Sequence, residues 1–269
     1  MAVKKQVALV TGASSGIGEA AALALADEGF EVVGTSRSGT GSAVGVSFVP
    51  LDVGDASSVQ AAVQQVIERH GRIDVLVNNA GIGSVGAVEE RSVAEEERVF
   101  DINVFGLIRM TKAVLPHMRA QGGGRIINLS SVLGLIPNPY MASYVASKHA
   151  VEGYTESLDH EVREFGVRAL IVEPAYTKTS FDANAVPPEV SLPLYAKRRT
   201  TFDEVMAVAM QGGDAPEVVA DVIVAAATDR KPRLRYTAGA TARRISGQRR
   251  FVPAGVFDKA IRKLNKLPA

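Results

Sequence analysis

Short apolar runs alternate with helical stretches along most of the chain. The first run, 7–10, reads Val-Ala-Leu-Val and precedes a glycine-rich turn and a helix expected over 17–28. A run that is apolar at every position is typical of a strand buried on both faces of a parallel sheet. Further strands are expected at 31–35, 46–51, 74–77, 125–129, 167–172 and 233–237, and helices at 55–70, 93–119 (as one helix or two), 140–165 and 214–228. Asp55 and Asp214 are the expected N-caps of two of these helices, and Pro216 the expected first residue of the last.

This alternation predicts an α/β fold, a doubly wound parallel sheet of about seven strands with helices on both faces. The 269 residues show no internal repeat and no linker, so we expect one domain over 1–269. Within it, the segment 179–213 is irregular and too long for a simple connection. Loops of this length often form substrate lids, and this one carries several large apolar residues.

Composition excludes several classes of protein. Hydrophobic residues make up 46% and charged residues 22%, which excludes a disordered chain. The absence of cysteine excludes disulfides, thiolate nucleophiles and Cys-ligated zinc, and the four scattered histidines predict no metal site. No apolar run reaches the ~18 residues that cross a bilayer, and residues 1–6 lack the long apolar core and the small-residue cleavage site of a signal peptide. A cytoplasmic protein is therefore expected.

Basic residues are concentrated in a C-terminal extension, 231–269. It holds eleven lysines and arginines and one acid, a net charge of +10 against −9 for the rest of the chain. Three roles remain open: a partly helical cap on the substrate site, an oligomer contact, or peripheral contact with an anionic membrane. Phe257, Ile261 and Leu264 share a helical face beside basic residues, a pattern that suits an interfacial helix. Nucleic acid is not an expected partner, because no nucleic-acid-binding motif accompanies the charge.

The glycine-rich turn after the first strand has the features of a phosphate-binding loop. Its glycines allow a tight turn and close backbone approach to a pyrophosphate, and the following helix offers free N–H groups. The spacing, Gly-x-x-x-Gly-x-Gly, differs from the common dinucleotide fingerprint, so a turn needed only for packing is the alternative. The expected cofactor contacts here are Gly12, Ser14, Ser15, Gly16, Ile17 and Gly18.

Three further segments accompany this loop. They are Asn-Asn-Ala-Gly at 78–81, Asn103, and Tyr144-Val-Ala-Ser-Lys148 with Ser131 thirteen residues before the tyrosine. In this order they resemble the classical short-chain dehydrogenase/reductase family over residues 6–180, and more loosely to the C-terminus. The branch that holds hydroxysteroid and retinol dehydrogenases is the most similar. The resemblance implies a Rossmann-type sheet and hydride transfer between a nicotinamide and a carbonyl or alcohol.

The reacting groups follow from this resemblance and from simple chemistry. Tyr144 is the expected acid/base, and a lysine one helical turn away would lower its pKa from about 10. That residue, Lys148, would also contact the nicotinamide ribose. The resemblance assigns Ser131 to hold the substrate oxygen, in preference to Ser130, and Asn103 to hold a water in a proton relay. A surface Tyr-Lys pair is the alternative for an isolated motif.

The end of the second strand predicts the cofactor. NAD-using relatives carry Asp where this chain has Ser36, and Arg37 has the fork geometry that suits a 2′-phosphate. We therefore expect NADP(H); the alternative is that Arg37 stacks on adenine or is solvated. The resemblance adds contacts from Asp52 and Val53 to the adenine.

The remaining expected cofactor contacts also come from the resemblance. They are Asn79, Ala80, Gly81, Pro174, Ala175, Thr177 and Thr179, together with Tyr144 and Lys148. Ala175 stands where the family usually has glycine, which adds a methyl group near the nicotinamide.

These features predict an NADP(H)-dependent oxidoreductase, in the reductive direction, for a lipophilic carbonyl or alcohol. An NAD-dependent alcohol dehydrogenase and a non-catalytic NADP(H)-binding sensor or scaffold are the rival interpretations. A homodimer or homotetramer is expected on the resemblance, through the helices near 104–120 and 140–165.

Overall fold

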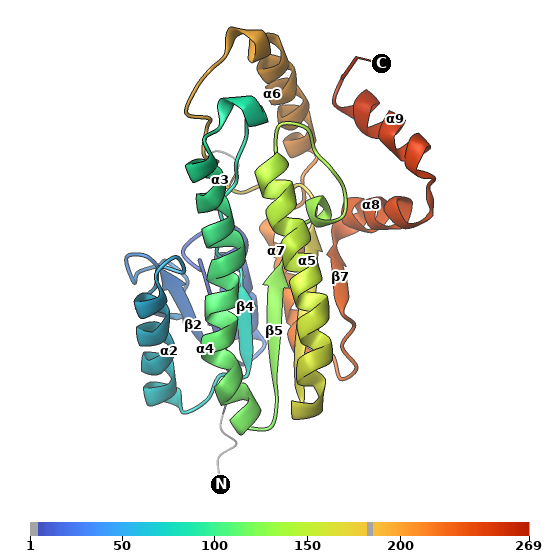
Figure 1. Ribbon diagram of the computed structural model, residues 1–269. Helices are drawn as coiled ribbons and strands as arrows, with labels where there is room; N and C mark the ends of the chain where they lie inside the picture. The colour runs from blue at the N-terminus through green and yellow to red at the C-terminus, as the bar shows by residue number, and fades with distance from the viewer. Residues whose placement is uncertain (1–4, 182–184, 269) are drawn as a thin grey trace.

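A single seven-stranded parallel sheet forms the centre of the computed structural model, which describes residues 5–181 and 185–268 (Figure 1). The spatial order is β3-β2-β1-β4-β5-β6-β7, so the chain reverses direction across the sheet between β1 and β4. The strands are β1 (Val7–Val10), β2 (Glu31–Ser36), β3 (Ser47–Pro50), β4 (Val75–Asn78), β5 (Gly124–Leu129), β6 (Val167–Pro174) and β7 (Arg235–Ala238). This confirms the predicted fold class.

Helices cover both faces of the sheet because its central strands are apolar on both sides. The helices α2 (Ala56–His70), α4 (Leu107–Ala120) and α5 (Ala142–Val162) lie on one face, in front of the strands in Figure 1. On the other face lie α1 (Gly16–Asp27) and α7 (Pro216–Thr228). The strand β1 lies inside the sheet, between β2 and β4, and all four of its residues are buried. The glycine-rich turn that follows it therefore lies in the middle part of the sheet's carboxyl edge.

The long helical stretch predicted over 93–119 is interrupted. It comprises α3 (Val93–Phe100), a π-helical turn (Asp101–Gly106) and then α4. A side chain at Gly106 would come within 2.8 Å of Val53 Cγ2, so the close approach of this turn to the end of β3 requires glycine. π-Helical turns are frequent at functional sites, and this one holds Asn103.

Two sequence-based expectations were wrong in this part of the chain. The segment 179–213 contains a helix, α6 (Ala196–Gln211), in which only Phe202 is buried; without an apolar stripe it gives no periodic signal. Asp214 is not the N-cap of α7, since Ala215 holds that position. The backbone of Asp214 instead pairs with Tyr176 and Lys178, which joins the end of α6 to the segment after β6.

The segment that carries α6 is fixed to the body by a buried carboxylate. Glu90 lies just before α3 and is 1% exposed. It accepts a hydrogen bond from the Leu192 backbone N–H at 2.8 Å and forms a salt bridge with Arg199 of α6.

The basic extension is helical after β7. It forms α8 (Gly239–Phe251) and α9 (Ala254–Leu264), separated by the extended residues Val252 and Pro253. Figure 1 shows α9 standing apart from the sheet, beyond α8. Among the described residues, no helix is long and apolar enough to cross a membrane.

Candidate active site

The turn between β1 and α1 has the conformation that the glycines permit. Gly12 and Gly16 have φ of 65° and 58°, which glycine adopts without strain. A Cβ on Gly18 would lie 2.2 Å from the Gly12 carbonyl oxygen, so this position must be glycine for the helix to approach the turn. Ser15 is the N-cap of α1, but its side chain makes no capping bond. The first N–H groups of α1 therefore remain available to a phosphate.

A network of hydrogen bonds joins this turn to the loop after β4. The Thr11 hydroxyl accepts from the backbone N–H groups of Asn79 and Ala80, each at 3.0 Å. In return, the Asn79 amide donates to the carbonyl oxygens of Thr11 at 2.9 Å and Gly12 at 3.2 Å. The two loops expected to contact the cofactor are thus held as one unit.

One cavity of about 780 Å³ runs along the carboxyl edge of the sheet and collects nearly all the predicted site residues. Those that line it are Gly12, Ser14, Ser15, Gly16, Ile17, Ser36, Arg37, Asp52, Val53, Asn79, Ala80, Gly81, Ser131, Tyr144, Lys148, Pro174, Ala175, Thr177 and Thr179. Gly18 and Asn103 lie behind its wall. The cavity follows the switch point between β1 and β4, where open α/β sheets bind ligands.

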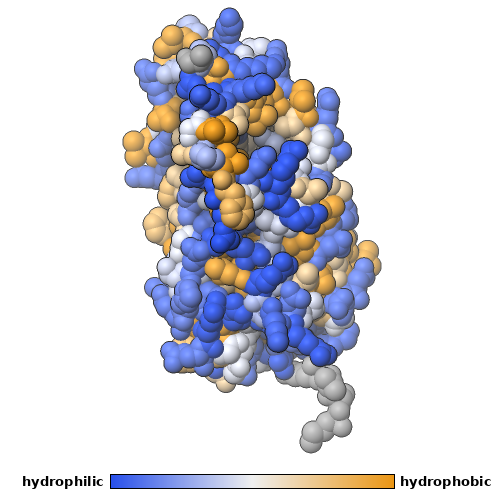
Figure 2. Space-filling model, turned by 90° about the vertical axis from the view of Figure 1, so that its right-hand side faces the viewer, coloured by the Kyte–Doolittle hydropathy of each residue, from blue (hydrophilic) through white to orange (hydrophobic). Residues whose placement is uncertain are grey.

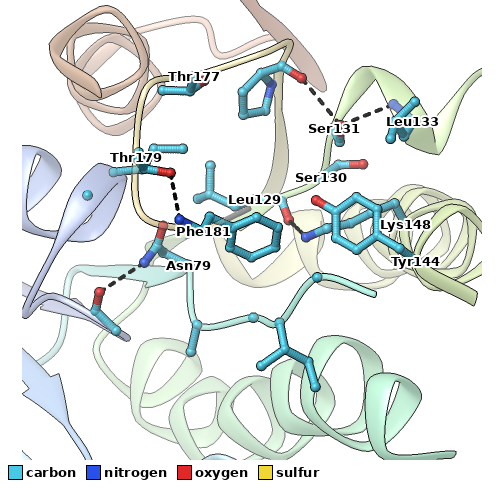
Figure 3. A pocket seen from close by; sticks show the side chains of 18 of the residues that line it. Asn79, Leu129, Ser130, Ser131, Leu133, Tyr144, Lys148, Thr177, Thr179 and Phe181 are labelled. Carbon is cyan, nitrogen blue, oxygen red and sulfur yellow. Dashed lines mark hydrogen bonds between the residues drawn. The ribbon is translucent and has the colours of Figure 1, made fainter. Parts of the chain in front are cut away.

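Tyr144, Lys148 and Ser131 share one wall of the cavity (Figure 3). Tyr144 and Lys148 lie one turn apart on α5, and the ammonium is 5.7 Å from the centre of the phenol ring. Ser131 follows β5; its hydroxyl accepts from the Leu133 N–H at 3.1 Å and donates to the Pro174 carbonyl at 3.4 Å. The Tyr144 ring lies 5.8 Å from that of Phe181, so the polar groups face an apolar side chain across the cavity.

Burial lowers the pKa of Lys148 to about 8, although the negative charge of Glu152 opposes this shift. Its ammonium donates to the Leu129 carbonyl at 2.7 Å. The lysine is thus positioned by the end of β5 and remains largely protonated at neutral pH. A cation held at this place favours a negative charge on a neighbouring phenol.

Asn103 is buried and three hydrogen bonds hold its side chain. Its carbonyl oxygen accepts from the Ile82 N–H at 2.8 Å, and its amide donates to the Ile82 carbonyl at 2.9 Å and to the Ser147 hydroxyl at 3.2 Å. It thereby joins the π-helical turn to the loop after β4 and to α5. Its role in a proton relay stays a prediction.

The far end of the cavity is formed by Ser36 and Arg37 after β2. Ser36 is engaged in its own turn, where its hydroxyl donates to the Thr40 carbonyl at 2.7 Å. Arg37 is exposed, and within residues 5–181 and 185–268 no carboxylate pairs with it. A guanidinium without an internal partner at the cavity rim is available to an anionic ligand.

An ionic cluster behind the wall that holds Tyr144 and Lys148 was not predicted. Arg235 of β7 reaches Glu152 at 2.9 Å, Glu156 at 2.5 Å and Glu173 at 3.1 Å. Burial, together with the neighbouring charge of Glu152, raises the pKa of Glu173 to about 7. The Ser130 hydroxyl lies beside Glu152, whereas Glu173 Oε2 is buried without a hydrogen-bond partner in the described part of the chain. One guanidinium facing three carboxylates leaves excess negative charge, which a bound proton would offset.

The end of the cavity beyond Tyr144 is apolar. Its lining comes from three separate parts of the chain: the segment after β5, α6 with its preceding loop, and the helices of the basic extension. These residues are Ile136, Pro137, Met141, Phe181, Val186, Met206, Ile245, Ile261 and Leu264. Ile261 and Leu264 belong to the helical face noted in the sequence, so the extension forms part of the cavity wall.

The chain is similar to known proteins over most of its length. The family model described as short chain dehydrogenase matches residues 6–189. The 3-ketodihydrosphingosine reductase of Bacteroides thetaiotaomicron is 43% identical over 182 residues, which cover 68% of each chain. A short-chain dehydrogenase from Streptomyces avermitilis has a TM-score of 0.82 and 33% identity, covering 98% of this chain and 96% of that one.

One similar structure was solved with a bound nucleotide. The short chain dehydrogenase/reductase from Burkholderia phymatum, solved in complex with NAD, has a TM-score of 0.76 and 31% identity. The alignment covers 89% of this chain and 92% of that chain. Together with the match over 6–189, these similarities show that the chain belongs to the short-chain dehydrogenase/reductase family of oxidoreductases.

Proposed function

We propose that this protein is an NADP(H)-dependent reductase that converts a lipophilic aldehyde or ketone to an alcohol. The observation that carries this proposal is the placement of Tyr144, Lys148 and Ser131 between a phosphate-binding turn and an apolar cavity end. A carbonyl substrate bound at the apolar end would lie next to both a proton donor, Tyr144, and the bound cofactor.

The residues present suit a dinucleotide. The close approach of Gly18 to Gly12 leaves room for a pyrophosphate over the N-terminus of α1, and the cavity continues on both sides of this point. The bound cofactor would supply the hydride that reaches the carbonyl carbon. Asn79, Ala80 and Gly81 would line its inner ribose, and Thr177 and Thr179 would lie near its nicotinamide.

The chain's own groups complete the reduction. The Tyr144 hydroxyl gives its proton to the carbonyl oxygen, and the O–H bond of the product forms as that of the tyrosine breaks. Ser131 Oγ holds the same oxygen, and the Lys148 cation stabilises the tyrosinate left behind. Asn103 would order a water that returns a proton to Tyr144 by way of Lys148.

Two observations support the choice of cofactor and substrate. Arg37 is a cation at the rim, where a 2′-phosphate would lie, and no carboxylate among the described residues pairs with it; Ser36 adds no negative charge there. The apolar residues beyond Tyr144 favour a lipophilic substrate, and the relative from Bacteroides thetaiotaomicron is a reductase of a ketone whose name denotes a sphingoid lipid.

Oxidation of NADPH and NADH with a panel of lipophilic aldehydes and ketones tests this proposal. We expect turnover with NADPH that falls by at least about 10²-fold in Tyr144→Phe, the size of a lost proton donor. Tyr195→Phe is the matched control, since Tyr195 lies outside the cavity and bonds Glu89. Full activity in Tyr144→Phe, or a preference for NADH, would overturn the corresponding part of the proposal.

A further inference from the structure

One flank of α9 combines exposed apolar and basic residues. With 3.6 residues per turn, Leu264, Val256, Lys263 and Lys259 follow one another around less than half of the helix circumference. We refer to these four residues as the α9 flank. Val256 and Leu264 are 58% and 60% exposed, and both lysines are exposed. Phe251, the last residue of α8, adds an aromatic ring that is 80% exposed.

The surroundings of this flank are strongly basic. Residues 239–266 hold eight lysines and arginines and a single acid, Asp258. Figure 2 shows the face of the molecule that carries α8 and α9, with hydrophobic side chains surrounded by hydrophilic ones. This surface differs from one that is only charged, because its exposed apolar side chains would be more stable if they were removed from water.

The side of α9 that adjoins this flank has a different environment. Ile261 lines the cavity, and Phe257 lies under the Arg249 guanidinium at 5.5 Å. Polar contacts hold the end of the helix to α6: Arg198 donates to the Lys266 carbonyl at 3.1 Å, and Lys266 reaches Glu204 at 3.3 Å. The α9 flank is thus the side of the helix left to solvent.

We propose that the α9 flank docks on an anionic lipid bilayer. Lysines beside Leu264 and Val256 suit a surface where phosphate groups lie directly above hydrocarbon, since the cations meet the phosphates while the apolar side chains enter the interface. The excess of +7 over 239–266 is complementary to such a surface. A purely electrostatic partner would leave Leu264, Val256 and Phe251 in water.

Leu264 connects this docking surface to the cavity. It lines the apolar cavity end and is also 60% exposed on the flank. Docking would therefore place the substrate entrance against the bilayer, so that a lipid-dissolved carbonyl enters beside α9 without crossing water. This step, which names the source of the substrate, rests on the proposed function; the docking itself does not.

Vesicle co-sedimentation of the whole protein tests docking without any need for turnover. We expect binding to vesicles of phosphatidylcholine with phosphatidylglycerol, negligible binding to phosphatidylcholine alone, and loss of binding at high salt. Each basic residue near an anionic surface contributes about fivefold in affinity. Lys259→Glu with Lys263→Glu should therefore lower the affinity by at least about tenfold.

A matched control separates the flank from net charge. Arg69→Glu with Arg119→Glu makes the same change in charge at exposed positions in the last turns of α2 and α4. Binding should survive in this control. An equal loss in both double variants would overturn the proposal, as would equal binding to neutral vesicles or no binding at all.

The absence of tryptophan in the chain allows a direct probe of insertion. Leu264→Trp should give an emission spectrum that shifts to the blue when anionic vesicles are added, because the indole enters the interface. Phe165→Trp, at a 40% exposed site beyond the end of α5, should show no shift. A shift in neither or in both would contradict docking through α9. Vesicle binding together with an inactive enzyme would sustain docking and refute the reductase.

Discussion

At the residue scale, Glu173 gives the clearest dependence on pH. Its pKa of about 7, raised by burial and by Glu152, lies above the 4.5 expected of an unfolded glutamate. The native state therefore holds a proton that the unfolded state releases between these values. The free energy of unfolding should fall as pH rises from about 5 to about 7, by up to about 3 kcal/mol.

Urea denaturation at a series of pH values measures this change. Glu173→Gln should flatten the profile, because its amide replaces the bound proton with a permanent donor beside Glu152. Glu156→Gln is the control: that side chain is 46% exposed, so the slope should persist. A slope unchanged in Glu173→Gln would assign the proton to another group.

The sequence identified the residues lining the cavity better than those behind it. Tyr144 and Lys148 could be predicted because they follow the glycine-rich turn, Asn-Asn-Ala-Gly and Ser131 in the order that resembles a known family; their four-residue spacing alone fits a surface pair equally well. The cluster of Arg235 with Glu152 and Glu173 could not, since β6 and β7 become neighbours only when the sheet forms. The available signal was Glu173, which directly follows the apolar run 169–172 of this strand.

At the scale of elements, the turn between β1 and α1 tolerates no side chain at Gly18. Gly18→Ala would bring its Cβ to 2.2 Å from a backbone oxygen, so the helix must move. We expect a loss of about 1–3 kcal/mol in unfolding free energy and weaker NADPH binding. Thermal denaturation and cofactor titration measure the two effects.

Gly247→Ala supplies the comparison within a helix. Nothing lies within 4 Å of the Cβ it would add to α8, so the substitution should raise stability by about 0.5–1 kcal/mol. If Gly18→Ala and Gly247→Ala changed the unfolding free energy equally, the close approach at Gly18 would not contribute to stability.

Helices and strands could be predicted where one of their faces is buried, because burial makes apolar residues recur at regular intervals in the sequence. The helix α2 matches its predicted end at His70, where Gly71 adopts the left-handed conformation typical of a C-cap. The helix α6 was not predicted because it has no apolar stripe. The loop before it and a buried salt bridge hold it in place.

At the scale of the whole molecule, cofactor binding should stabilise the fold. A ligand at a hundredfold excess over its Kd adds about 2.7 kcal/mol, which a thermal shift detects. We expect NADPH to raise the melting temperature more than NADH at equal concentration. Arg37→Ala should abolish the difference; a persisting preference would show that Arg37 does not read the 2′-phosphate.

The helices α4 and α5 lie side by side on one face, with Phe105 beside the start of α4 and 52% exposed (Figure 1). We expect this face to join two copies, so that light scattering gives a dimer or tetramer of the 28.4 kDa chain. Phe105→Glu should weaken the assembly, whereas Val44→Glu, at an 86% exposed site, should not. A monomeric wild-type protein would refute this interface.

Glu90 has a consequence for how such an enzyme can change its substrate. One buried carboxylate, bonded to Leu192 and Arg199, attaches the segment with α6 to the rest of the fold. The side chains that reach the cavity from this segment, such as Met206, make no part of that attachment. Substitutions of the cavity-lining side chains of this segment can therefore change the substrate, while Glu90 keeps the segment in the same position relative to Tyr144.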